Sequence, residues 1–271
     1  MRGMTKEEKI RSFDGTELYL KRDIPDAPKA VAVIVQGLCE HQGRYDHLTE
    51  RFCADGIAVY RFDHRRHGRS EGKRVYYSDF NEIVDDVHVV TELAKREQPG
   101  LPLFVVGHSM GGYAATLFAT KYPGEAAGII LSGALTRYNT PCAGPLPVDA
   151  PADSYVPNAL GSGVCSDPAV VEAYGRDPYV EKEISIGLLN SIWGGIQWLK
   201  ANAACFTDPV IMLHGACDGL VSEKDSRELF GDIASSDKTL KIYAHLFHEI
   251  FNEPCKDEIL DEVLAWIKKR I

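Results

Sequence analysis

Residues 102–112 read Pro-Leu-Phe-Val-Val-Gly-His-Ser-Met-Gly-Gly, and the prediction of the fold rests on this stretch. Its first five residues are almost entirely apolar, which predicts a buried strand, and an Ala-rich helical pattern follows directly after the glycines. Gly107, Ser109 and Gly111 form a G-x-S-x-G pattern at the junction. Between a strand and a helix, this pattern holds the serine on a strained turn with its hydroxyl above the sheet edge. Ser109 is therefore the predicted nucleophile.

Short apolar runs alternate with amphipathic runs along the chain. Strands are predicted at 30–35, 57–62, 102–106, 128–132, 210–214 and 239–244, and helices at 79–96, 109–122, 168–175, from 178 to about 200, and 255–270. Two of the strand runs are apolar throughout, which is typical of parallel strands buried on both faces. The alternation predicts an α/β fold with a mostly parallel central sheet flanked by helices.

A Pro-rich stretch interrupts this alternation. Residues 135–157 carry five prolines and show no clear period, and two further helical patterns follow before the next strand. Loops of this length inside a compact domain are usually functional or disordered. We therefore predict a core domain formed by 1–134 and 206–271, with 135–205 inserted as a cap over the active site. A long surface excursion without a function is the alternative.

Composition limits the classes of partner. The chain has 271 residues, of which 45% are hydrophobic and 25% charged, and its formal net charge is −9. No basic run is long enough for nucleic-acid binding, which requires clustered cations. The N-terminal residues are too charged for a signal peptide, and no apolar run approaches the ~20 residues of a membrane span. The seven scattered cysteines are expected to be reduced thiols, so a cytoplasmic location is predicted.

A serine hydroxyl needs a base, and the base needs an acid that orients it. In an elbow of this type the order is serine, then acid, then histidine, with each residue following a strand. Asp218 follows the strand 210–214 and is the predicted acid. His248 lies further into the loop after the last strand than His245, so His248 is the predicted base and His245 the second candidate.

The tetrahedral intermediate of such a reaction needs two N–H donors aimed at its oxygen. The backbone N–H of Met110, directly after the nucleophile, is one predicted donor. The other is the backbone N–H of Leu38, in the loop after the strand 30–35, where Gly37 is expected to let the chain turn.

Five segments together resemble the monoacylglycerol lipase and lysophospholipase group of the α/β-hydrolases. They are Gly37-Leu38-Cys39-Glu40-His41-Gln42-Gly43-Arg44-Tyr45, Phe62-Asp63-His64-Arg65-Arg66-His67-Gly68-Arg69-Ser70-Glu71-Gly72, the elbow at 107–112, the acid segment 215–221 and the base segment 248–253. The resemblance implies the α/β-hydrolase fold. It also implies hydrolysis of monoacylglycerols or related single-chain lipids through an acyl-enzyme, with no cofactor, and it favours His248 over His245.

Two positions depart from that family's pattern. Gln36 stands where the family usually has a histidine, and Arg66 where it usually has a glycine. Arg66 is expected either to bring a positive charge to the pocket mouth or to be a solvated surface residue. His64 and His67 are expected to stabilise a turn, and no metal site is predicted because no third ligand is evident.

The cap sequence 184–199 is apolar on almost every side, which is typical of a buried helix or of one that also faces an apolar ligand. Ile192, Trp193 and Ile196 are the candidate substrate contacts, and packing of the cap onto the core is the alternative. Gly194-Gly195 is a candidate hinge. Such a cap would also permit transient contact with a membrane surface.

Two other functions remain open at this point. A small-ester or aryl esterase, of the feruloyl type, would use the same three catalytic residues on another substrate. A ligand-binding scaffold without turnover would have the fold alone. A small-molecule ester or lipid is the predicted partner in the leading hypothesis, and the oligomeric state is left open.

Overall fold

The computed structural model describes residues 3–271, except for the side chain of Ser162. The central sheet has eight strands in the order β1-β2-β4-β3-β5-β6-β9-β10. Its strands are β1 (Met4–Arg11), β2 (Glu17–Ile24), β3 (Ala30–Val35), β4 (Ile57–Phe62), β5 (Leu103–His108), β6 (Gly128–Ser132), β9 (Val210–Gly215) and β10 (Lys238–Tyr243). All pairs from β4 to β10 are parallel, and β2 pairs antiparallel with both β1 and β4. The prediction of a mostly parallel α/β sheet is confirmed.

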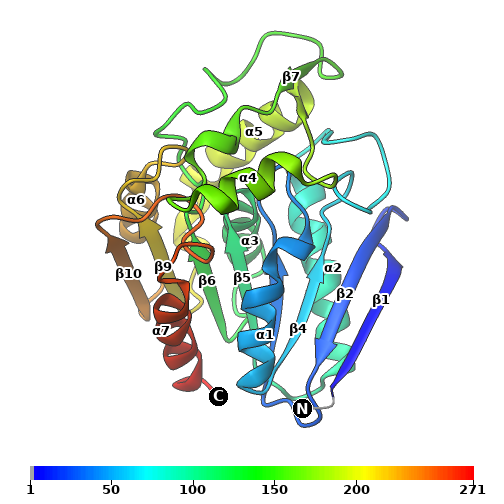
Figure 1. Cartoon of the computed structure of the whole chain (residues 1–271), viewed down its shortest axis with the longest axis vertical. Helices are drawn as coiled ribbons and strands as arrows, with labels where there is room; N and C mark the ends of the chain where they lie inside the picture. Colours follow the sequence, from blue (N-terminus) through cyan, green and yellow to red (C-terminus); the bar gives the residue numbers. More distant parts are fainter. Residues whose placement is uncertain (1–2) are drawn as a thin grey trace.

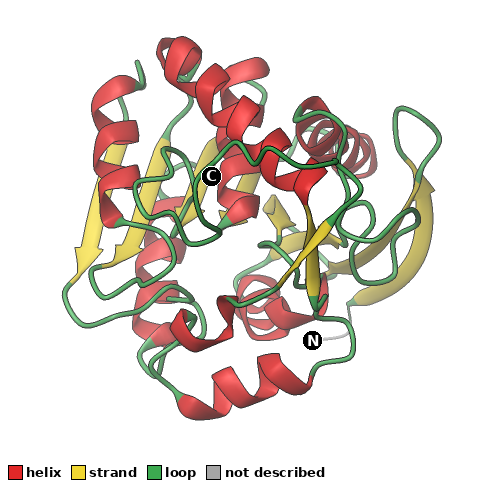
Figure 2. Cartoon of the chain, turned by 90° about the horizontal axis from the view of Figure 1, so that it is seen from above, coloured by secondary structure: helices red, strands yellow, loops and turns green. Residues whose placement is uncertain are grey.

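Helices cover both faces of this sheet (Figure 2). They are α1 (Asp46–Ala54), α2 (Asn81–Glu97), α3 (Met110–Lys121), α6 (Glu223–Asp232) and α7 (Lys256–Lys268). Alternate residues of β3 point to opposite layers, so Ala32 packs in one cluster with α1 and α7, and Val33 in another with α2 and α3. All six residues of β3 are buried because helices lie on both sides, which explains why its sequence is apolar throughout.

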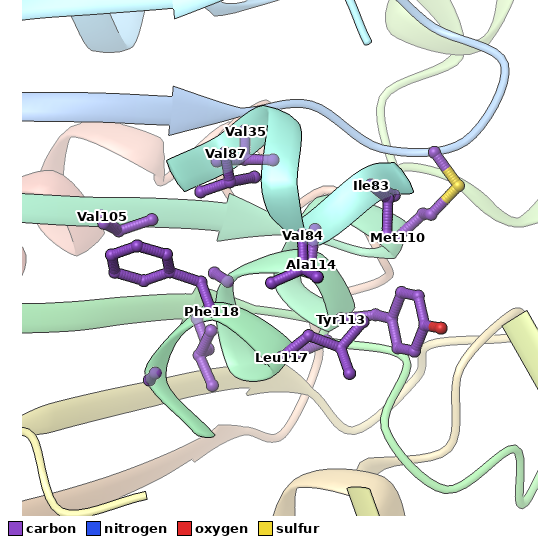
Figure 3. Packing of buried hydrophobic residues seen from close by; sticks show 14 of the residues in the cluster. Val35, Ile83, Val84, Val87, Val105, Met110, Tyr113, Ala114, Leu117 and Phe118 are labelled. Carbon is purple, nitrogen blue, oxygen red and sulfur yellow. The ribbon is translucent and has the colours of Figure 1, made fainter. Parts of the chain in front are cut away.

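Helix α3 is the most deeply buried of these helices. Every residue from Met110 to Thr120 is buried, so the helix has no polar face. Phe118 packs beside Val105 of β5, and Tyr113 extends away from the sheet (Figure 3). A helix that is buried all round is held firmly in place, and it fixes the position of its first turn, which follows Ser109, the predicted nucleophile.

The chain between β6 and β9 lies above the carboxyl ends of the parallel strands (Figure 1). It contains β7 (Tyr155–Pro157), η2 (Leu160–Gly163), α4 (Pro168–Arg176), β8 (Glu183–Ser185), α5 (Ile186–Asn202) and η3 (Ala203–Cys205). The strands β7 and β8 form a small antiparallel sheet of their own. That residues 135–205 form a separate cap domain remains a prediction.

Helix α5 runs unbroken through the proposed hinge at Gly194-Gly195. A Cβ on Gly195 would lie 1.8 Å from the Tyr113 hydroxyl oxygen of α3. The structure therefore gives Gly195 a different role from the expected one: it lets α5 approach α3 closely. Ile192 and Ile196 are buried in the same core cluster, in agreement with the packing alternative for the cap.

The N-terminal hairpin of β1 and β2 has no counterpart in the sequence prediction. Residues of β1 are mostly exposed and charged, and in register they face charged residues of β2, such as Glu7 opposite Lys21. Charged side chains on an edge strand hinder pairing with other chains, but they also remove the apolar alternation that marks a strand. No helix among residues 3–271 is both long and apolar enough to cross a bilayer.

Replacing Gly111 by Ala is expected to destabilise the protein, because the new Cβ would lie 2.0 Å from the carbonyl oxygen of Val35 and 2.4 Å from that of Gln36. Backbone atoms cannot move aside cheaply, so the loss should be about 1–3 kcal/mol or more in urea unfolding. Gly231→Ala is the matched control, since nothing lies within 4 Å of its Cβ position near the end of α6. It should raise the free energy of unfolding by up to about 1 kcal/mol. Equal effects of the two changes would contradict the close contact.

Candidate active site

Ser109 occupies the single residue between β5 and α3. Its backbone angles are φ 55° and ψ −119°, a strained conformation for a residue with a side chain. The flanking glycines are required by space: a Cβ on Gly107 would lie 2.3 Å from the Gly111 carbonyl oxygen. The structure therefore has the strained turn that the G-x-S-x-G pattern predicts, with the hydroxyl at the carboxyl edge of the sheet.

The predicted base and acid are joined by a hydrogen bond. The Nδ1–H of His248 donates to Oδ2 of Asp218 over 2.7 Å, and both side chains are almost completely buried. Asp218 lies in the loop after β9, and His248 lies in the loop between β10 and α7. His245, the second candidate for the base, is exposed to solvent and does not line the pocket described below.

Four nitrogen atoms lie within 3.1 Å of the carboxylate oxygens of Asp218. The backbone N–H groups of Leu220 and Val221 each donate to Oδ1 over 2.8 Å, while the rings of His248 and His214 contact Oδ2. Burial alone would raise the pKa of Asp218, but the charge of His248 and these donors together hold the pKa well below its ordinary value. Asp218 is therefore a buried carboxylate that stays ionised.

The charge of Asp218 also acts on His248. Burial lowers the pKa of His248, and the neighbouring carboxylate outweighs this effect, so the pKa lies above its ordinary value of 6.5. His248 and Ser109 line the same pocket, although no hydrogen bond joins the two side chains among the described contacts. Links of this kind are often long in unliganded enzymes and shorten only when the substrate binds.

The loop after β3 lies against the elbow. A Cβ on Gly37 would lie 3.3 Å from Cβ of Ser109 and 2.8 Å from a carboxylate oxygen of Glu40. The left-handed backbone in this loop is at Cys39, with φ 62°, and not at Gly37. Gly37 is therefore needed because its backbone passes close to Ser109 and Glu40, whereas the sequence analysis expected it to let the chain turn. Leu38 lines the pocket, and Met110 begins α3, so the chain places both predicted donors beside Ser109.

A buried charged cluster borders this loop, and the sequence analysis assigned it no role. Arg44 donates two hydrogen bonds of 2.7 Å to Glu249 and one of 2.6 Å to Glu40. Glu40 also accepts hydrogen bonds from the Gly37 N–H and the Tyr45 hydroxyl. The sequence held part of the signal for this cluster: Glu249 is adjacent to His248, and Arg44 follows Glu40 by four residues. Nothing in the sequence, however, indicated that the two segments are in contact.

The pocket at Ser109 is small and is lined by both charged and apolar residues. Its volume is about 40 Å³. The lining residues are Gly37, Leu38, Glu40, Arg44, His108, Ser109, Leu135, Cys142, Leu160, Val164, Tyr174, Leu220, Val221, His248 and Glu249. The predicted substrate contacts Ile192, Trp193 and Ile196 are not among them, so the structure does not place them at the site. The lining residues from the segment between β6 and β9 are instead Leu135, Cys142, Leu160, Val164 and Tyr174.

The two departures from the family pattern lie away from the reacting groups. Gln36 donates from Nε2 to the Glu40 carbonyl oxygen. Arg66 has φ 65°, the conformation that favours the family's usual glycine, and its guanidinium contacts Glu82 and the carbonyl oxygen of Tyr76. Arg66 is neither a pocket residue nor a fully solvated one, which corrects both expectations.

His64 and His67 are buried in the loop after β4. Each ring has one hydrogen bond to a backbone carbonyl, His64 to Gln36 and His67 to Arg65. Burial lowers the pKa of His64 to about 3 and that of His67 to about 4, so both rings are neutral and support the loop. Among residues 3–271, no group of three or more metal-ligating side chains is close enough to hold a metal ion.

Comparison with known proteins matches most of the chain. The family model described as "Serine aminopeptidase, S33" matches residues 26–255. A monoacylglycerol lipase from Mycolicibacterium smegmatis is 38% identical, with 96% of each chain covered. The human monoglyceride lipase is 34% identical over 95% of this chain and 88% of its own length.

Solved structures give the same result. A monoacylglycerol lipase from Paleococcus ferrophilus matches with a TM-score of 0.83 and 28% identity, covering 94% of this chain and 100% of the other. These findings confirm the resemblance argued from the five segments. The chain belongs to the serine aminopeptidase S33 family of α/β-hydrolases and, within it, to the monoacylglycerol lipase and lysophospholipase group.

Proposed function

We propose that this protein hydrolyses the ester bond of monoacylglycerols, with Ser109 as nucleophile, His248 as general base and acid, and Asp218 as the residue that orients it. The observation that carries the proposal is that a histidine hydrogen-bonded to a buried, ionised aspartate lines one pocket with a serine on a strained elbow. Membership of the family confirms that the chain is a carboxylic ester hydrolase.

The proposed reaction has two halves. Nε2 of His248 takes the proton of Ser109 as Oγ attacks the ester carbonyl, and the imidazolium is stabilised by Asp218. The negative charge on the carbonyl oxygen is stabilised by the N–H groups of Leu38 and Met110. Collapse of the intermediate breaks the ester bond, and His248 returns the proton to the leaving alcohol. Water then attacks the acyl-enzyme by the same route and releases the fatty acid.

The lining of the pocket supports a substrate with one polar and one apolar end. Glu40, Arg44 and Glu249 are its charged lining residues, and Cζ of Arg44 also lies 4.9 Å from the ring centre of Tyr174. Leucine and valine side chains make up much of the remaining lining. A monoacylglycerol has a hydroxylated head and a hydrocarbon chain, so each part would meet a matching surface.

The volume of the pocket supports movement of the cap. A cavity of about 40 Å³ is far smaller than the roughly 300–1,000 Å³ of a typical ligand pocket, so an acyl chain needs the pocket to widen. We therefore propose that the segment carrying Leu160, Val164 and Tyr174 moves aside when the substrate enters. Transient contact of this cap with a lipid surface belongs to the same proposal.

We also propose a cytoplasmic site of action. All seven cysteines are free, which is expected of a reducing compartment.

Replacement of Ser109 by Ala is expected to lower kcat by about 10⁴–10⁶-fold, because only binding and the N–H donors remain. Purified proteins should be compared on one monoacylglycerol by measuring released fatty acid. Ser236→Ala is the matched control, since Ser236 is exposed and precedes β10, and it should leave kcat unchanged. Substantial activity in the Ser109 variant would eliminate this mechanism.

The rate is expected to fall as the pH decreases through the pKa of His248, because the imidazolium cannot accept the proton of Ser109. The pKa of His248 is raised, so the midpoint of this acid limb in kcat/KM should lie above 6.5. NMR titration of His248 in the Ser109→Ala protein should give a similar value, and Asp218→Asn in that background should lower it. An acid limb well below pH 6.5 would contradict the assigned pair.

A substrate series separates the proposed activity from an aryl esterase. We expect monoacylglycerols to have a higher kcat/KM than p-nitrophenyl butyrate or feruloyl esters, with lysophospholipids tested in the same series. Higher activity on feruloyl esters would favour the aryl esterase. A steady decline in rate beyond four acyl carbons would argue against an acyl-chain site.

A further inference from the structure

A second histidine shares the catalytic acid. The Nε2 atom of His214, on β9, lies 3.1 Å from Oδ2 of Asp218, the same oxygen that accepts the hydrogen bond of His248. The side chain of His214 is fully buried, and it does not line the pocket. We propose that His214 is a positioning residue that donates to Asp218 and thereby sets how strongly Asp218 attracts the proton of His248. This inference rests on the proposed function, since it assigns Asp218 to the catalytic reaction.

The hydrogen-bond partners of His214 determine which nitrogen carries its proton. Nε2 lies 3.0 Å from the carbonyl oxygen of Val221, which can only accept, so Nε2 must be the donor. Nδ1 lies 2.8 Å from the hydroxyl of Ser226 and accepts from it. The Nε2–H is therefore donated to Val221, with Oδ2 of Asp218 3.1 Å from the same nitrogen, and the Ser226 hydroxyl on α6 is the partner of Nδ1.

This arrangement places two imidazole nitrogens within 3.1 Å of Oδ2 of Asp218. A hydrogen bond to a carboxylate stabilises its negative charge and lowers its affinity for a proton. With His214 donating, Asp218 is a weaker base, so it attracts the imidazolium of His248 less strongly. Loss of the His214 donor should therefore raise the pKa of His248, and the effect is separate from any change in folding.

Other groups also face His248 and must be taken into account. Glu249, next in the chain, and Glu40, in the loop after β3, both raise the pKa of His248 in addition to Asp218. His108, at the end of β5, has its ring centre 4.6 Å from that of His248, and burial lowers the pKa of His108 to about 3. His108 is therefore neutral at assay pH. The polar partners of His214 are Ser226, Val221 and Asp218, so these other groups are expected to act equally in the variants below.

The test compares His214→Gln with His214→Leu in the full-length protein. The amide nitrogen of glutamine can replace Nε2 as a donor, whereas leucine fills the space without one. We expect His214→Leu to lower kcat/KM on a monoacylglycerol by about tenfold and to move the acid limb of the pH profile up by about half a unit to one unit. His214→Gln should keep the wild-type limb and remain within about threefold of the wild-type kcat/KM.

Ser226→Ala is the second variant, in case the leucine protein does not fold. It keeps the ring and removes the partner of Nδ1, which holds the ring's orientation, so a smaller upward shift of the same limb is expected. Thermal unfolding of each variant reports stability separately. Two results would show a structural role only and overturn the inference. One is lower stability with an unchanged acid limb in the leucine and alanine variants. The other is an acid limb that shifts as far in the glutamine variant as in the leucine variant.

Failure of the proposed function gives a different result. In that case the Ser109→Ala protein would retain activity, whatever happens in the His214 variants. If Ser109→Ala is inactive and the acid limb of the His214→Leu pH profile does not move, the assignment of the three catalytic residues is kept and the role of His214 is rejected.

Discussion

The contact between the serine elbow and the loop after β3 is the constraint on which the site depends. Gly111 lies directly against the carbonyl oxygens of Val35 and Gln36, and a Cβ on Gly37 would lie 3.3 Å from Cβ of Ser109. Strands β3 and β5 are adjacent and parallel, with Val35 opposite Gly107, so their carboxyl ends lie level. The fold therefore places the nucleophile and the loop with Leu38 together without a long connection between them.

A buried negative charge is the second requirement. Asp218 would be costly to ionise in the interior without compensation, and the four nitrogens within 3.1 Å of its oxygens supply that compensation. Two come from its own loop and two from imidazoles on different segments, His214 on β9 and His248 before α7. The groups that keep the carboxylate ionised also orient the base, so the same contacts serve both stability and the proposed chemistry. The buried cluster of Arg44 and Glu249 holds the base loop from its other side.

Most of the sheet and the three predicted catalytic residues could be placed from sequence, because buried parallel strands are apolar throughout and each catalytic residue follows one of them. A local sequence pattern cannot show contacts between segments that are far apart in the chain. The charged hairpin strand β1 has no apolar alternation, and the link of Glu40 and Arg44 to Glu249 joins segments about 200 residues apart. Ile192 and Ile196 are equally apolar whether they face a ligand or the core, and only the packing against α3 distinguishes the two.

The central claim is that one hydroxyl, at Ser109, is activated by the His248–Asp218 pair. Its most direct test is reaction with a fluorophosphonate followed by peptide mapping by mass spectrometry. The account predicts one adduct per chain, located on Ser109, that forms much more slowly when His248 is replaced by alanine. An adduct on another residue, or labelling of Ser109 at the same rate without His248, would contradict it.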